Sequence, residues 1–162
     1  MSMIGNVVRV SQEELEEFLK DSALCDHKVE TEENKEEEWF LDLGKFWEGI
    51  QYILTGEGIT EITEPTILTR AFYTFQLLDI EQDLGHGPAQ YLTKDQVKET
   101  NKAFQEFEVE MPDGNDMMKK SIYPEIWNET EAIDDLLEMW HEFKSFYKVA
   151  AENDQAILTF VS

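Results

Sequence analysis

The spacing of apolar residues distinguishes the two ends of the chain from its middle. Residues 3–10 are mostly apolar and β-branched, which predicts a strand that ends at Ser11. Residues 156–161 predict a second strand near the C-terminus. The motif Ser11-Gln12-Glu13-Glu14 has the pattern of a capping box, so we expect a helix over about residues 12–21.

The clearest helical pattern lies between Leu43 and Leu54, where apolar residues form one broad stripe. Asp42 is the expected N-cap of this helix, and Gly56 is expected to end it. The stripe is typical of a face that packs against a core.

Two further helices are expected in the second half of the chain. A capping box at residues 93–96 opens the first, which continues to about residue 108, and the second covers about residues 129–152. Residues 22–38 are expected to form a solvated loop or a short helix, and residues 75–80 a strand. The glycine- and proline-rich motifs at residues 85–88 and 112–115 predict turns.

Strands at both ends with helices between them predict that the termini pair in one small sheet. The expected fold class is therefore α+β: a single domain over residues 1–162, with several helices packed on the sheet. Hydrophobic residues make up 41% of the chain and aromatic residues 12%. This is too much apolar material for a disordered acidic chain, so we expect a well-filled core.

Charge restricts the class of partner. The chain has 13 Lys and Arg against 36 Asp and Glu, a net charge of −23. Such a surface repels phosphate backbones and anionic lipids, which argues against nucleic acid and membranes as partners. The start of the chain lacks the pattern of a signal peptide, and Cys25 is the single cysteine, so a cytoplasmic location is expected.

Five blocks of sequence occur in the order known from one family. They are MSMIGN at the start, LDLGKFWEGIQYILTG at residues 41–56, GHGPAQYLTKDQV at residues 85–97, IYP at residues 122–124, and FYKVAAENDQAILTFV at residues 146–161. On these blocks the chain resembles the YfbM-like family, a bacterial group classed as a domain of unknown function. The resemblance implies a small, single-domain protein and supplies no activity, cofactor or catalytic residue.

The chain departs from the family pattern at three positions. In the turn that reads roughly Gly-Tyr-Gly-Pro-Ala-Arg-Tyr-Leu, it has His86 in place of the tyrosine and Gln90 in place of the arginine. Glu48 stands where a histidine is expected. If the arginine and histidine form an anion-binding or acid–base site in other members, this chain lacks part of it.

Motifs for catalysis and metal binding are missing from the sequence. The three histidines, His27, His86 and His141, do not have metal-ligand spacing, and Cys25 has no partner at a zinc interval. The sequence also lacks the common nucleophile and phosphate-binding motifs. We therefore expect no metal, no cofactor and no catalytic residue, and enzymatic activity remains an open question that leans towards none.

The first functional hypothesis is a non-enzymatic domain that binds a basic protein. Residues 30–38 include Glu36, Glu37 and Glu38 and hold six glutamates against one lysine, next to Trp39. Aromatic anchors surrounded by charge are typical of protein-binding patches, and Trp127 is a second expected anchor. An immunity-type protein that neutralises a cationic toxin or nuclease is one concrete version.

The alternative hypothesis is a small-ligand-binding protein or enzyme. His86 lies between two glycines in a turn, and a pocket near His86, Tyr91 and Tyr123 is expected under this hypothesis. Tyr123 could equally line a groove for a protein partner. The sequence leaves the oligomeric state open.

Overall fold

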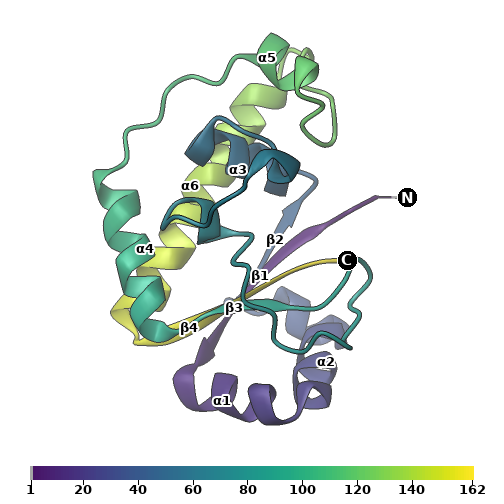
Figure 1. The fold of residues 1–162 in the computed structure, drawn as a ribbon, viewed down its shortest axis with the longest axis vertical. Coiled ribbons are helices and arrows are strands. Elements are labelled where there is room, and N and C mark those ends of the chain that lie inside the picture. The colour runs from purple at the N-terminus through teal and green to yellow at the C-terminus, as the bar shows by residue number, and fades with distance from the viewer. Residues whose placement is uncertain (1) are drawn as a thin grey trace.

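A four-stranded antiparallel sheet forms the centre of the computed structural model, which describes residues 2–162 (Figure 1). Strand β1 (Gly5–Ser11) pairs along its whole length with β4 (Gln155–Val161). The outer strands are β2 (Phe40–Gly44) beside β1 and β3 (Gln90–Leu92) beside β4, so the order is β2-β1-β4-β3. The α+β class and the pairing of the termini are thus confirmed.

Helices cover both faces of this sheet. Helices α1 (Gln12–Lys20) and α2 (Ser22–Glu30) lie on one side, and α3 (Trp47–Thr55), α4 (Lys94–Glu106) and α6 (Ala132–Glu152) lie on the other (Figure 1). The short helix α5 (Gly114–Lys119) lies beyond α3 at the end of the molecule.

The side chains of β1 explain why helices are needed on both faces. Val7 belongs to the core under α3, α4 and α6, whereas Val8 and Val10 belong to the core under α1 and α2. Successive residues of a strand point to opposite faces, so a strand with buried valines on both faces must be covered on both. The expected well-filled core is confirmed, and it has two layers.

Three of the helix ends expected from the sequence are present. The Ser11 hydroxyl accepts a hydrogen bond from the Glu14 amide at 3.0 Å, and Thr93 and Gln96 form a complete capping box. Gly56 ends α3 in the left-handed conformation, with φ of 75°. None of the helices described over residues 2–162 has the length and apolar character needed to cross a membrane.

The predicted start of α3 is wrong. Residues 40–44 form β2, with Phe40 opposite Val8, and α3 begins only at Trp47. Asp42 does not cap a helix; its Oδ1 atom accepts a hydrogen bond from the Gly44 amide at 2.6 Å. The apolar residues of β2 happen to continue the helical spacing of α3, and this coincidence hid the boundary.

Two other expectations are corrected by tertiary contacts. Residues 75–80 form a single bridge, between Leu77 and Gln90, instead of a strand. Residues 112–115 include the start of α5, which Asp113 caps. Of the two alternatives expected for residues 22–38, the structure has the short helix: the segment folds into α2 and a 3-10 helix at Glu32–Glu36. Two more 3-10 helices occur at Ile59–Glu61 and Thr69–Ala71.

Candidate functional site

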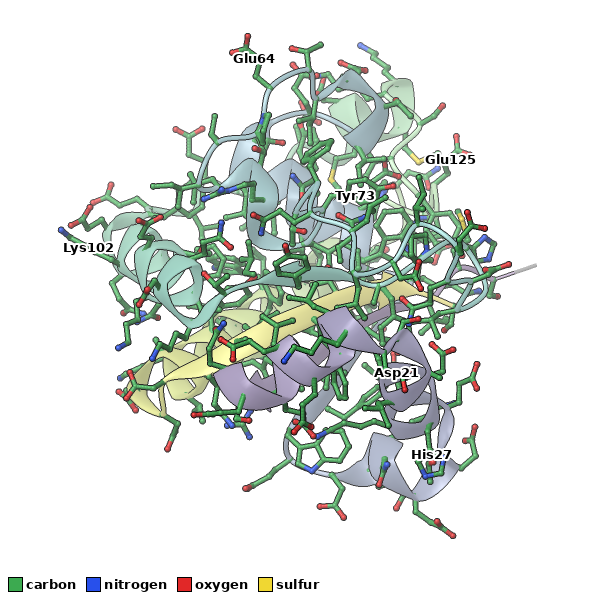
Figure 2. The ribbon with its side chains drawn as sticks, turned by 60° about the horizontal axis from the view of Figure 1, so that its bottom comes forward. Asp21, His27, Glu64, Tyr73, Lys102 and Glu125 are labelled. Carbon is green, nitrogen blue, oxygen red and sulfur yellow. The ribbon has the colours of Figure 1, made fainter. Side chains whose placement is uncertain are left out.

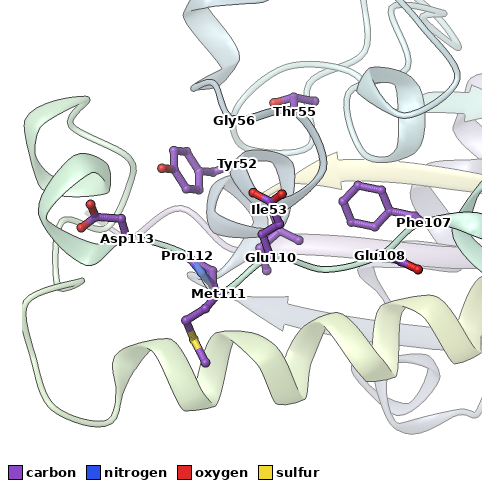
Figure 3. A pocket seen from close by; sticks show the side chains of 10 residues that line it. All are labelled: Tyr52, Ile53, Thr55, Gly56, Phe107, Glu108, Glu110, Met111, Pro112 and Asp113. Carbon is purple, nitrogen blue, oxygen red and sulfur yellow. The ribbon is translucent and has the colours of Figure 1, made fainter.

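An open groove of about 460 Å³ lies between the C-terminal half of α3 and the segment that joins α4 to α5 (Figure 3). We call it the α3 groove. Helix α3 contributes the aromatic and aliphatic side chains of Tyr52 and Ile53, and the joining segment contributes residues 107, 108 and 110–113. Figure 3 shows the joining segment running along the groove in an extended path, with α6 on its other side.

The joining segment alternates apolar and acidic residues. Its sequence Phe-Glu-Val-Glu-Met over residues 107–111 has a period of two, as in a strand. Residues 108–112 make no backbone hydrogen bond to another segment within residues 2–162. The backbone donors and acceptors of this segment are therefore available to a partner chain.

Two carboxylates of the segment are available to bind a cation. Glu108 and Glu110 are exposed and form no ion pair with any residue of the described chain. Met111, next to them, is 71% exposed. The groove therefore presents unpaired negative charge beside apolar surface.

One end of the groove is closed by a hydrogen bond between α3 and α5. The Tyr52 hydroxyl donates to Asp116 Oδ2 at 2.6 Å. Burial and the neighbouring carboxylate raise the pKa of Tyr52 above its ordinary value. The same hydrogen bond, together with the nearby Lys120, lowers the pKa of Asp116. Tyr52 is therefore a neutral donor at neutral pH, fixed in position by an ionised acceptor.

Lys120 is the cation at this end of the groove. Its Nζ atom donates to the Gly56 carbonyl at 2.8 Å, and it lies 3.5 Å from carboxylate oxygens of both Glu57 and Asp116. It is thus held by the C-terminal end of α3, where a positive charge is favourable. Lys120 offsets the carboxylates around it and leaves Glu108 and Glu110 uncompensated.

Comparisons with known proteins assign the chain to a family. A family model described as "Domain of unknown function (DUF1877)" matches residues 1–160. The chain belongs to the DUF1877 family. The resemblance expected from the sequence is confirmed by a solved structure, that of a protein of unknown function, YfbM from Escherichia coli. The two chains are 16% identical, with a TM-score of 0.72, over 98% of this chain and 99% of the other.

The similarity to YfbM is one of fold: the two proteins share the α+β architecture over almost the whole chain. Among curated proteins, none matches this chain. The DUF1877 family therefore supplies a fold without an activity, and any function has to be argued from the residues of this chain.

In this DUF1877 protein, Glu48 has a structural position. It is 8% exposed, and its two carboxylate oxygens accept hydrogen bonds from the amides of Ile59 at 3.0 Å and Tyr123 at 2.8 Å. Glu48 thereby joins α3 to the 3-10 helix that follows it and to the segment at Tyr123, 75 residues further along the chain. Glu48, which stands where the family pattern has a histidine, is therefore a buried side chain that connects parts of the core.

The predicted patch at Glu36, Glu37, Glu38 and Trp39 is only partly open. The three glutamates are exposed, but the Lys28 ammonium lies 4.3 Å from the centroid of the Trp39 ring. Lys28 also forms an ion pair with Glu14 at 2.8 Å. The face of Trp39 is already occupied by a cation of the protein itself.

Trp127 does not lie on a docking surface. It is 2% exposed, and its indole Nε1 donates to the Ile122 carbonyl at 2.7 Å. Its ring packs 6.0 Å from Phe46, centroid to centroid. The expectation that Trp127 is an exposed anchor beside Pro124 is wrong, because α3 and α6 cover the side chain.

The predicted pocket near His86, Tyr91 and Tyr123 is not formed as one cavity. His86 is exposed and borders a cavity of about 50 Å³ that includes neither tyrosine. The Tyr123 hydroxyl accepts a hydrogen bond from the Met3 amide at 3.0 Å, and its ring lies 5.9 Å from Trp47. A cavity of this size suits about one or two waters rather than a metabolite.

The residues of the α3 groove were missed in the sequence. The alternation at residues 107–111 is a strand signal, but it follows directly on the helical pattern of α4 and is short. Tyr52 stands beside the apolar stripe of α3, and its position in the sequence carries no functional signal of its own. The signal that could have found the groove is the combination of period-two alternation with Pro112, which ends it.

Proposed function

We propose that this protein is an interaction domain that binds an extended basic segment of a partner protein in the α3 groove. The observation that carries the proposal is the free edge at residues 108–112, where unpaired carboxylates and unpaired backbone groups occur together. Each of these features alone is common on protein surfaces. Together they suit an extended partner segment that forms backbone hydrogen bonds and carries basic side chains.

The backbone supports binding by strand addition. A partner chain that runs beside residues 108–112 gains main-chain hydrogen bonds, as in other complexes in which a peptide extends a free edge. Alternate side chains of that partner then face the groove. Tyr52, Ile53 and Phe107 provide an apolar and aromatic wall for them.

Charge supports a basic partner. Glu108 and Glu110 project from alternate positions of the segment, so lysines or arginines at alternate positions of the partner match their spacing. The net charge of −23 speeds the encounter with a cationic protein and makes the complex sensitive to salt. A cationic toxin or nuclease, as for an immunity-type protein, is one partner of this chemistry.

The patch at Glu36–Glu38 and Trp39 is the competing location for the same function. It has more glutamates in sequence, but Lys28 covers Trp39 and the Glu38 carbonyl already accepts a hydrogen bond from Arg9 at 2.8 Å. We therefore favour the α3 groove. The two locations make different predictions for charge-neutralising variants.

A matched pair of variants tests the location. The test ligand is a fluorescein-labelled peptide with alternating lysine and valine, measured by fluorescence anisotropy at low salt. Glu108→Gln/Glu110→Gln and Glu36→Gln/Glu38→Gln each remove two negative charges at positions two residues apart. We expect the first variant to weaken binding by about tenfold and the second by less than about twofold.

The opposite ranking would move the site to the Glu36–Glu38 patch. Equal and small effects of the two variants would mean that the peptide responds only to net charge, and the α3 groove would then not be a binding site. Circular dichroism of both variants controls for loss of fold. Capture from a host lysate, with a high-salt wash and mass spectrometry, then identifies the natural partner.

A further inference from the structure

Two stretches of this acidic chain contain no Asp or Glu: residues 65–78 and residues 84–94. They lie side by side in the structure. The Leu78 amide donates to the Ala89 carbonyl at 2.8 Å, and the Tyr91 amide donates to the Gln76 carbonyl at 3.0 Å. We call the surface that they form the acid-free face. It continues the sheet beyond β3.

Large apolar side chains are exposed on this face. Phe75 is 44% exposed and Leu77 is 43% exposed. Tyr73 packs edge to face against Phe75, with ring centroids 5.4 Å apart. In Figure 2, Tyr73 lies near the middle of the view, and Glu64 and Lys102 lie at its edges.

The backbone at Phe75 is held in a conformation that is unfavourable for an aromatic residue. Its φ is 62°, in the left-handed region where glycine is preferred. The Phe75 amide donates to Gln90 Oε1 at 2.9 Å, and Gln76 Nε2 donates to the Tyr91 carbonyl and to Gln96 Oε1, both at 2.8 Å. This amide network fixes the segment while Phe75 stays in solvent.

We propose that the acid-free face binds a second copy of this chain and forms a two-fold symmetric dimer. Two copies that each carry a charge of −23 repel one another over the rest of their surface. In a two-fold contact the same face meets itself, so the face has to be self-complementary. An apolar face whose two stretches hold no carboxylates meets this condition, because no carboxylates of those stretches are brought together at its centre.

The surroundings of the face define its rim. Asp79, Glu81 and Asp83 lie between the two stretches. The carboxylates of Asp79 and Asp83 accept hydrogen bonds, from Ser22 at 2.6 Å and from the Gly85 amide at 2.9 Å respectively, whereas Glu81 is exposed. Arg70, within the face, has Glu99 at 3.9 Å. Residual repulsion in the dimer therefore comes from charges at the rim and beyond, where salt can screen it.

The dependence on salt concentration distinguishes this dimer from the complex with a basic partner. Between about 0.01 M and about 1 M NaCl the screening length falls from about 30 Å to about 3 Å. Dimerisation through the acid-free face is expected to strengthen over this range, because repulsion between the copies is screened. Binding of a basic peptide in the α3 groove is expected to weaken over the same range, so either proposal can fail without the other.

The test is sedimentation equilibrium of the full chain and of three variants at low and high salt. Phe75→Gly removes the exposed ring at a φ that suits glycine, and Leu77→Gln makes the face polar. Leu24→Gln is the matched control, because Leu24 is 47% exposed but lies on α2, away from this face. We expect the dimer to gain stability with salt, to weaken by at least about tenfold in Phe75→Gly and Leu77→Gln, and to be unchanged in Leu24→Gln.

Phe75→Gly is expected to fold, since glycine suits a φ of 62°, and circular dichroism of each variant controls for loss of fold. A chain that stays monomeric at every salt concentration would overturn the proposal. A dimer that persists in both face variants, or that weakens with salt, would overturn it as well.

Discussion

Tyr52 on α3 and Asp116 on α5 are joined by a hydrogen bond of 2.6 Å between the phenolic oxygen and the carboxylate. This contact ties two elements that are 64 residues apart in sequence, at one end of the α3 groove. Helix α5 is short, so its position depends on such contacts. The width of the groove at that end is therefore set by Tyr52.

The pH dependence of stability tests the Tyr52–Asp116 contact. The pKa of Asp116 is lowered in the folded protein, first by the Tyr52 hydroxyl and then by Lys120. A lowered carboxyl pKa contributes stability that is present above the ordinary pKa and is lost as the pH falls through the folded value. We expect Tyr52→Phe to destabilise the protein at pH 7 and to have a smaller effect below about pH 4.

Urea unfolding at the two pH values measures this difference. Tyr91→Phe is the control, because the Tyr91 hydroxyl has no hydrogen-bond partner among residues 2–162. An equal loss of stability at both pH values in Tyr52→Phe would show that the hydroxyl acts without stabilising the ionised Asp116.

Glu48 should be among the most sensitive polar positions of the fold. Glu48→Ala leaves the buried amides of Ile59 and Tyr123 without acceptors, so we expect a loss of about 2–4 kcal/mol in the free energy of unfolding. Glu48→Gln keeps one acceptor oxygen and should lose less. Denaturant unfolding measures both, and a loss below about 0.5 kcal/mol in Glu48→Ala would contradict the assigned connection.

Cys25 should be unreactive in the folded protein. The side chain is 0% exposed, and burial raises the pKa of the thiol to about 12, against a smaller opposing effect of its hydrogen bond with Gln82. The thiolate is the reactive species, so little of it exists at pH 8. We expect an aromatic disulfide reagent to modify Cys25 slowly in the native state and completely in urea; rapid native modification would contradict the packing of α2.

The free edge of the α3 groove predicts a directional effect of proline. Amides at successive positions of an extended segment point to opposite sides, so only one of Glu108 and Val109 can donate to a partner strand. We expect either Glu108→Pro or Val109→Pro, but not both, to weaken binding of the alternating Lys–Val peptide. Neither amide has a partner in the described chain, so both variants should fold.

Unchanged binding in both proline variants would mean that the peptide binds through side chains alone. Equal losses in both would point to a change in the shape of the segment. Glu108→Gln supplies the charge control for the first of the two positions.

Local signals predicted the parts of the fold that depend on neighbouring residues. The cap at Ser11, the capping box at Thr93 and the end of α3 at Gly56 were all visible in the sequence, because each depends on a few adjacent side chains. The pairing of the termini followed from two strands at the chain ends. These elements carry most of the architecture.

The errors arose where distant contacts decide the outcome. Residues 40–44 form a strand because β1 lies beside them, although their apolar spacing also fits a helix. Trp127 is buried because α3 and α6 cover it, despite its charged neighbours in sequence. The α3 groove depends on where the chain between α4 and α5 passes, and no local pattern specifies that path.

The most direct test of the proposed function is to map the bound peptide on the protein by nuclear magnetic resonance. The isotope-labelled full chain is titrated with the alternating Lys–Val peptide at low salt, and amide shifts are followed residue by residue. We expect the largest shifts on residues 107–113 and on the C-terminal half of α3. Largest shifts on residues 32–39, or small shifts spread over the whole acidic surface, would contradict it.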